Sequence, residues 1–81
     1  MKLWKLSAIN RDTSRYFGWD THQGFVVRAE SEQRAREIAA EYAEGDYYNL
    51  PTPWTNPKKT LCVELSFDGD EEVILHDYNA G

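Results

Sequence analysis

The chain has 81 residues, a net charge of −5, an aromatic content of 14% and one cysteine. This length supports one modest core, so we expect residues 1–81 to form a single domain. One cysteine excludes an intrachain disulfide, and no apolar run is long enough to predict a membrane-spanning helix. A thiol-poor chain without a signal-peptide pattern fits a reducing cytoplasm.

Two strands are predicted in the first part of the chain, at residues 3–9 and 25–29. Side chains alternate in both segments, which is typical of strands with one buried face. The side chains expected to face inward are Trp4, Leu6 and Ala8 in the first strand and Phe25, Val27 and Ala29 in the second.

A helix is predicted next, over residues 32–43. Ser31 suits the N-cap, and Gly45 suits a C-cap just beyond the last turn. Glu32 and Arg36 lie four residues apart and are expected to pair on the outer face. One apolar stripe is expected to face the sheet, and it consists of Ala35, Ile38, Ala39 and Tyr42.

A hairpin is predicted over residues 60–76. Asp68-Gly69-Asp70 has strong turn chemistry, and Val73 to His76 is expected to form a fourth strand. The order of elements is then β-β-α-β-β, which predicts an α+β two-layer sandwich with a four-stranded antiparallel sheet and one helix. In the first strand of the hairpin, the residues expected to face inward are Leu61, Val63, Leu65 and Phe67.

Two long segments, residues 10–24 and 44–59, match neither strand nor helix. Prolines at 51, 53 and 57 exclude regular strand pairing in the second segment. Long irregular connections in a compact domain are usually functional or disordered, and disordered segments are poor in aromatics. These two segments are rich in aromatics, which favours ordered loops that form a binding surface. The aromatic residues are Tyr16, Phe17 and Trp19 in the first and Tyr47, Tyr48 and Trp54 in the second.

Charge is unevenly distributed along the chain. Residues 1–36 hold seven basic and four acidic groups, whereas residues 37–81 hold ten acidic and two basic groups. An acidic half attracts basic partners and repels nucleic-acid backbones, so direct nucleic-acid binding is not expected. A solvated surface that keeps the protein soluble explains the same pattern. The predicted acidic face consists of Glu37, Glu41, Glu44, Asp46, Asp68, Asp70, Glu71 and Glu72.

No arrangement of residues predicts catalysis, a metal site or a cofactor. Cys62 lies in the middle of a predicted strand, with neither a helix N-terminus nor a basic neighbour to lower its pKa. The pairs Asp20/His22 and His76/Asp77 match no established metal-ligand spacing. Gly-rich phosphate loops and serine nucleophile elbows are also missing from the sequence.

A second kind of site is compatible with the aromatic loops. Arginines beside aromatic rings can hold the phosphate of a nucleotide while the rings stack on its base. Such a ligand pocket, within one protomer or across a homodimer, would use Arg11, Arg15, Tyr16, Trp19, Asp20, Arg28 and Trp54.

Several stretches resemble small uncharacterised proteins of tailed phages and prophages. They are Trp4-Lys5-Leu6, Gly18-Trp19-Asp20-Thr21, Gly24 to Ala29, the pattern Ser31…Ala35-Arg36…Ala39-Ala40, and Asp77 to Gly81. The resemblance covers most of the chain but transfers no site residue, since no activity is assigned to these proteins. It implies a viral origin, and small acidic phage proteins of this size often inhibit host machinery, as anti-CRISPR and other anti-defence proteins do. The inhibitory function is therefore inferred by analogy with other small acidic phage proteins and not from a sequence motif.

The sequence therefore favours a non-enzymatic, phage-encoded binding protein that inhibits a host defence component in the host cytoplasm. Its acidic face would meet a basic surface of the partner, and Trp19, Tyr47, Tyr48 and Trp54 would anchor the contact. One alternative is a sponge that sequesters a nucleotide immune signal in the aromatic and arginine pocket. The other is a minor virion accessory protein. A monomer and a homodimer are both compatible with the sequence, because strand edges can pair between copies.

Overall fold

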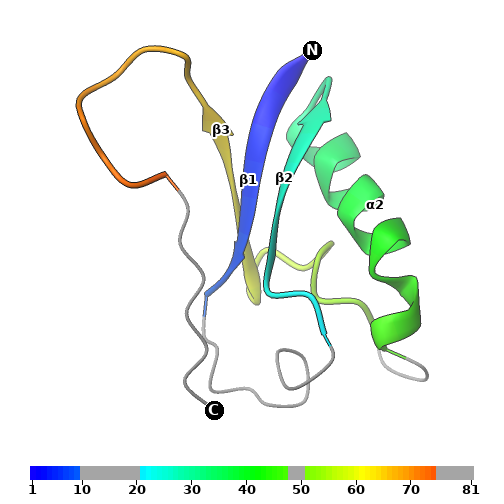
Figure 1. Ribbon diagram of the computed structural model, residues 1–81. Helices are drawn as coiled ribbons and strands as arrows, with labels where there is room; N and C mark the ends of the chain where they lie inside the picture. Colours follow the sequence, from blue (N-terminus) through cyan, green and yellow to red (C-terminus); the bar gives the residue numbers. More distant parts are fainter. Residues whose placement is uncertain (10–20, 48–50, 75–81) are drawn as a thin grey trace.

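The computed structural model describes residues 1–9, 21–47 and 51–74. Three antiparallel strands form one sheet in the order β2-β1-β3, and a single described α-helix, α2, packs on one face of it (Figure 1). The strands are β1 (Lys2–Ala8), β2 (Gly24–Ala29) and β3 (Thr60–Leu65), and the helix is α2 (Glu32–Tyr42). A 3-10 turn, η1 (Glu44–Asp46), follows the helix. The predicted α+β class is confirmed.

The register of the sheet determines which side chains lie under the helix. Leu6 is opposite Phe25 on one side and Cys62 on the other, so these three residues share the face that α2 covers. Leu6 is fully buried, and Phe25 and Cys62 pack against the core. The inward faces predicted for the first two strands are confirmed. The buried core consists of Leu6, Val27, Ala29, Ala35, Ala39, Ala43, Tyr47 and Trp54.

The helix begins as predicted and ends differently. Ser31 is the N-cap, and its hydroxyl accepts a hydrogen bond from the backbone N–H of Arg34 at 3.2 Å. The C-cap is Ala43, and Gly45 lies inside η1, so the prediction of Gly45 as C-cap is wrong. Tyr42 is 74% exposed and does not continue the buried stripe. The chain turns into η1 directly after Tyr42, which leaves its ring at the edge of the layer.

The structure confirms that Arg36 pairs with Glu32 but not that the pair lies on the outer face of the helix. It pairs with Glu32, as expected, with 3.0 Å between Nε and Oε2. However, its side chain is buried, because the segment 51–59 packs over this part of the helix. Nη1 donates to the Trp54 carbonyl at 3.0 Å and to Thr60 Oγ1 at 2.9 Å. Arg36 therefore joins three parts of the chain and does not lie on an outer face.

The phase of β3 is opposite to the prediction. Thr60 is fully buried and Cys62 is half-buried, whereas Leu61 and Val63 are exposed on the other face of the sheet. The hydrogen bonds from Arg36 explain the difference, because they pull the Thr60 hydroxyl inward and alternation then turns Leu61 outward. Strand β3 ends at Leu65, and Phe67 beyond it is 98% exposed.

The predicted fourth strand is not confirmed by the described part of the chain. Residues 66–74 contain no strand, and the remainder of the prediction, Leu75 and His76, lies outside the described residues. The observed order over the described chain is β-β-α-β, so the last strand of the predicted β-β-α-β-β sandwich is not confirmed. Residues 66–74 instead form an irregular segment, drawn in orange in Figure 1, on the side of the sheet away from α2.

Candidate functional site

Six of the ten predicted site residues in the two long segments lie outside the described residues. The described ranges exclude residues 10–20 and 48–50. The predicted site residues that fall there are Arg11, Arg15, Tyr16, Trp19, Asp20 and Tyr48. Their predicted roles in binding remain predictions.

Tyr47 and Trp54 belong to the core, which corrects their predicted role as surface anchors. Trp54 is 0% exposed and meets the Phe25 ring edge-to-face, with 4.9 Å between ring centroids. Tyr47 is buried, and burial raises the pKa of its phenol, as does the nearby charge of Asp46 to a smaller extent. A hydrogen bond with the Trp54 side chain partly opposes that rise in pKa. Neither ring can contact a partner without unfolding the loop.

The predicted nucleotide pocket is divided by the sheet. Trp54 packs beside Phe25, on the face that α2 covers. Arg28 is exposed and pairs in register with Leu3, on the opposite face. These two predicted pocket residues therefore cannot contact the same ligand within one protomer.

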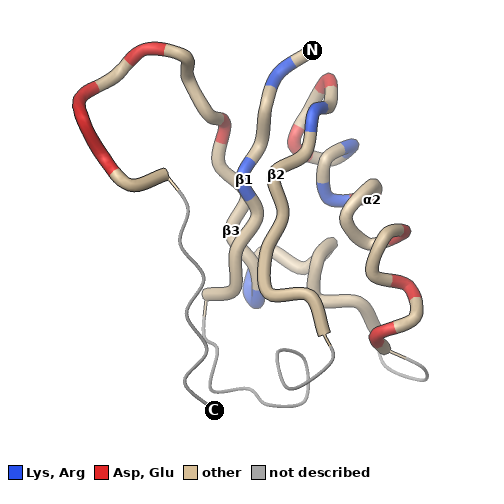
Figure 2. Tube along the Cα trace, in the orientation of Figure 1, with Lys and Arg blue, Asp and Glu red and all other residues tan. Residues whose placement is uncertain are grey.

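The eight acidic residues form two separate groups instead of one face. Figure 2 shows one group along the second half of α2 and the other in the segment after β3, with the sheet between them. Within the first group, Glu37 accepts from Arg34 Nη1 at 3.1 Å. Asp46 is engaged by His22, so its carboxylate is not an open contact for a partner. The second group, Asp68, Asp70, Glu71 and Glu72, is exposed throughout.

The face of the sheet opposite α2 exposes large apolar side chains. Val26, Lys5 and Val63 form one row across the three strands, and Ser7 lies beside Leu61 in the next. Val26 is 47% exposed, Val63 46% and Leu61 52%. We call this surface the open face and define it as Leu3, Lys5, Ser7, Val26, Arg28, Leu61, Val63 and Leu65. The alternation in β3 correctly predicts that its apolar side chains share one face of the sheet. The prediction that this face is the buried one is wrong.

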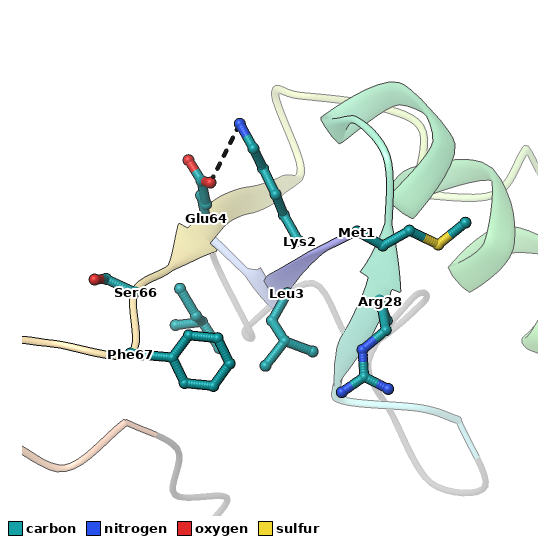
Figure 3. A pocket seen from close by; sticks show the side chains of 8 residues that line it. Met1, Lys2, Leu3, Arg28, Glu64, Ser66 and Phe67 are labelled. Carbon is teal, nitrogen blue, oxygen red and sulfur yellow. Dashed lines mark ion pairs between the residues drawn. The ribbon is translucent and has the colours of Figure 1, made fainter.

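Phe67 borders the open face at the end where the chain begins. Figure 3 shows the ring beside Leu3, with Arg28 on the same side of the sheet, while Lys2 and Glu64 point to the other side. Lys2 Nζ and Glu64 Oε1 are 3.4 Å apart and form an exposed ion pair on that other side. These residues line a hollow with a volume of about 430 Å³. An exposed phenyl ring beside an open hollow is available to a partner.

The acidic segment after β3 borders the same face. Glu72, Val73 and Ile74 line a second hollow together with side chains of β1 and β3. Lys5 Nζ donates a hydrogen bond to the Ile74 carbonyl, which ties the segment to the sheet. The exposed acids of residues 68–72 therefore lie next to apolar side chains.

A cluster around His22 was missed by the sequence analysis. Both the backbone N–H and the Nδ1 atom of His22 contact Asp46 Oδ2, at 2.8 and 2.9 Å. The imidazole stacks on Phe25 with 5.1 Å between centroids, and Tyr42 meets it edge-on at 5.3 Å. His22 and Asp46 are 24 positions apart in sequence, so no local pattern predicts this contact. The cluster ties η1 to the start of β2.

Cys62 faces the helix from the middle of β3. Burial raises the pKa of its thiol, and the positive charge of Arg36 opposes that rise only in part. A raised pKa keeps the sulfur protonated and weakly nucleophilic at neutral pH. His76 and Asp77, the second pair considered for metal-ligand spacing, lie outside the described residues.

Within residues 1–9, 21–47 and 51–74, no group of three or more His, Cys, Asp and Glu side chains is placed to hold a metal ion. In the same part of the chain, no helix has the length and apolar character needed to cross a membrane. Comparison with protein-family models, curated proteins and solved structures finds no match.

Proposed function

We propose that this chain is a non-enzymatic protein-binding domain that uses the open face and the adjoining segment 66–74 to cover a surface of a partner. The observation that supports it is the exposure of Leu61, Val63 and Phe67 on one side of the sheet. Contiguous apolar surface of this kind marks interaction sites in small proteins. The contact centres on this face and not on the aromatic loops.

The chemistry of the partner is inferred from the rim of that face. Asp68, Asp70, Glu71 and Glu72 place four carboxylates within five residues beside the apolar side chains. Lys5 is directed to the Ile74 carbonyl and Lys2 to Glu64, so two of the nearby positive charges are engaged within the chain. The complementary surface is apolar at its centre and basic at its edge.

A nucleic-acid-binding surface of a host defence protein would supply the basic part of this complementary surface. CRISPR effectors hold their guide and target strands in positively charged channels, and an acidic inhibitor that covers such a channel excludes the nucleic acid. The viral origin rests on the resemblance of the sequence to phage proteins. The inhibitor is therefore proposed to act by occupying a basic channel, without any chemical step.

The test compares two charge reversals of equal size. Asp70→Lys/Glu72→Lys changes the rim of the open face, whereas Glu30→Lys/Glu44→Lys changes two exposed acids away from it. Each variant is expressed in cells that carry a CRISPR system directed against a challenge phage, and plaques are counted. We expect the natural chain and the Glu30/Glu44 variant to restore plaques and the Asp70/Glu72 variant to fail. Circular dichroism of both purified variants checks that the fold is kept.

A third variant tests the apolar part of the surface. Phe67→Ser removes a ring that is 98% exposed and leaves the core untouched. If Phe67→Ser and the Asp70/Glu72 variant both inhibit as well as the natural chain, the open face is not the binding surface. If the natural chain restores no plaques against any defence system tested, inhibition of defence is the wrong function.

A further inference from the structure

Strand β2 forms an edge of the sheet and borders a groove. Within the described ranges, its only strand partner is β1. The groove has a volume of about 580 Å³ and runs between β2 and α2. Five consecutive residues of β2, 24–28, line it, opposite Ile38, Ala39 and Tyr42 of the helix. An edge strand beside a groove can receive another strand through its outward N–H and C=O groups.

The helix presents a stripe of three side chains beside this groove, of which the outer two are exposed and the central one is partly buried. Arg34, Ile38 and Tyr42 are spaced by four residues, so they lie above one another on one side of α2. Tyr42 is 74% exposed although its ring touches the rings of His22 and Phe25. Arg34 and Tyr42 lie at equal spacing on either side of Ile38, and Arg34 Nη1 also pairs with Glu37 Oε1 of its own chain at 3.1 Å.

Charge along this edge changes sign from one end to the other. Figure 2 shows basic residues at the end of β2 and the start of α2, and acidic residues toward the end of α2. The last turn of α2 contains no basic residue. The acids Glu30 and Glu32 also lie at the basic end, and Glu32 is neutralised there by Arg36 at 3.0 Å. An occupant that complements this edge must be acidic where the edge is basic and basic where the edge is acidic.

We propose that the occupant is a second copy of this chain, paired antiparallel through β2 around a two-fold axis. Antiparallel pairing sets the Arg28 end of one copy against the Gly24 end of the other. The basic end of each copy then lies beside the acidic end of the other, so the two edges are electrostatically complementary. Residues opposite each other in a sheet share a face, which places the axis at Val26 or Val27. The two sheets then form one six-stranded sheet with both helices on the same side.

The same axis brings the two helical stripes together. Ile38 lies near Ile38 of the second copy, and Arg34 lies near Tyr42 and Glu41 of the second copy. An arginine over a tyrosine ring, beside a carboxylate, is a favourable cross-interface contact. Burial of the exposed Tyr42 ring follows from this arrangement. The proposal is independent of the open face, which stays free in the dimer.

Sedimentation equilibrium of the full chain over a wide concentration range tests this proposal. We expect a monomer–dimer equilibrium for the natural chain. Arg34→Glu and Glu41→Arg should each raise the dimer dissociation constant by about tenfold or more, and the double variant Arg34→Glu/Glu41→Arg should recover most of the affinity. Asp70→Lys/Glu72→Lys should leave the equilibrium unchanged, because the segment that carries both residues follows β3 and lies across the sheet from α2.

Circular dichroism of each variant checks that it is folded. Arg34 and Glu41 are both exposed, so their substitution is not expected to unfold the domain. A monomer at every concentration overturns the proposal and leaves the groove to an extended peptide of another protein. A dimer that neither single reversal weakens also overturns it, since the contact then lies on a different surface.

Discussion

Arg36 donates two hydrogen bonds to Thr60, one to its hydroxyl at 2.9 Å and one to its carbonyl at 3.1 Å. The Thr60 hydroxyl donates in turn to the Pro53 carbonyl at 2.8 Å. The guanidinium is therefore the junction of α2, the segment 51–59 and the first residue of β3. A buried guanidinium needs partners for its donors, and here the backbone of an irregular segment supplies them.

Removal of this side chain is the first prediction. Arg36→Ala leaves the carbonyls of Trp54 and Thr60 buried without their donor, so it should lower the free energy of unfolding by about 3 kcal/mol. Glu37→Ala is the matched control, because its ion pair with Arg34 lies on the exposed side of the same helix and its loss should change stability by less than about 0.5 kcal/mol. Urea unfolding followed by circular dichroism measures both. Equal losses in the two variants would contradict the junction role of Arg36.

The same junction shows why the fold was only partly predictable. Alternation in residues 3–9 and 25–29 and the serine cap of the helix are local signals, and the structure confirms all three. The phase of β3 depends on Arg36, 24 residues away in sequence, so alternation alone chose the wrong face. An apolar pattern shows that a strand has two unlike faces but not which of them a single helix will cover.

The candidate site was less predictable than the fold. Aromatic residues in long loops suggested a binding surface, yet Trp54 fills the core that a helix rich in alanine leaves open. The acidic residues were counted as one face, although they lie on elements that the sheet separates. Composition predicts the net charge of the protein. The position of each charge on its surface depends on how distant parts of the chain pack together.

Trp54 should therefore be far less tolerant of substitution than its loop position suggests. Trp54→Ala empties a fully buried site and should cost about 3–5 kcal/mol, enough to unfold much of a domain of this size. Phe67→Ala is the control, since a ring that is 98% exposed contributes little to the core. Thermal unfolding of both variants gives the comparison. A small loss for Trp54→Ala would mean that the segment 51–59 does not pack on the helix as described.

The N-cap provides a third, smaller effect. Ser31→Ala removes the acceptor for the Arg34 N–H and should lower the free energy of unfolding by about 1 kcal/mol. Ser31→Asp keeps an acceptor and adds a negative charge at the helix N-terminus, so its stability should stay close to that of the natural chain. Urea unfolding at neutral pH distinguishes the two. If both variants lose the same stability, the hydroxyl is not acting as a cap.

Stability should also fall at alkaline pH because of Tyr47. Its pKa is raised above the ordinary value of 10.0, chiefly because burial disfavours the phenolate. A group with a raised pKa in the folded state contributes stability that is complete below its unfolded pKa. That contribution is lost as the pH rises through the folded pKa. Cys62 acts in the same direction, with a pKa raised above 9.0 by burial.

Urea unfolding from neutral to strongly alkaline pH measures this loss, and two variants separate the contributions. Tyr47→Phe keeps the buried ring and removes the ionising hydroxyl, so the decline in stability above the ordinary tyrosine pKa should become shallower. Cys62→Ala should remove only the part of the decline that begins nearer the ordinary cysteine pKa. A Tyr47→Phe profile that falls as steeply as that of the natural chain would show that other groups control the alkaline transition. In that case the phenol ionises as easily in the folded state as in the unfolded chain.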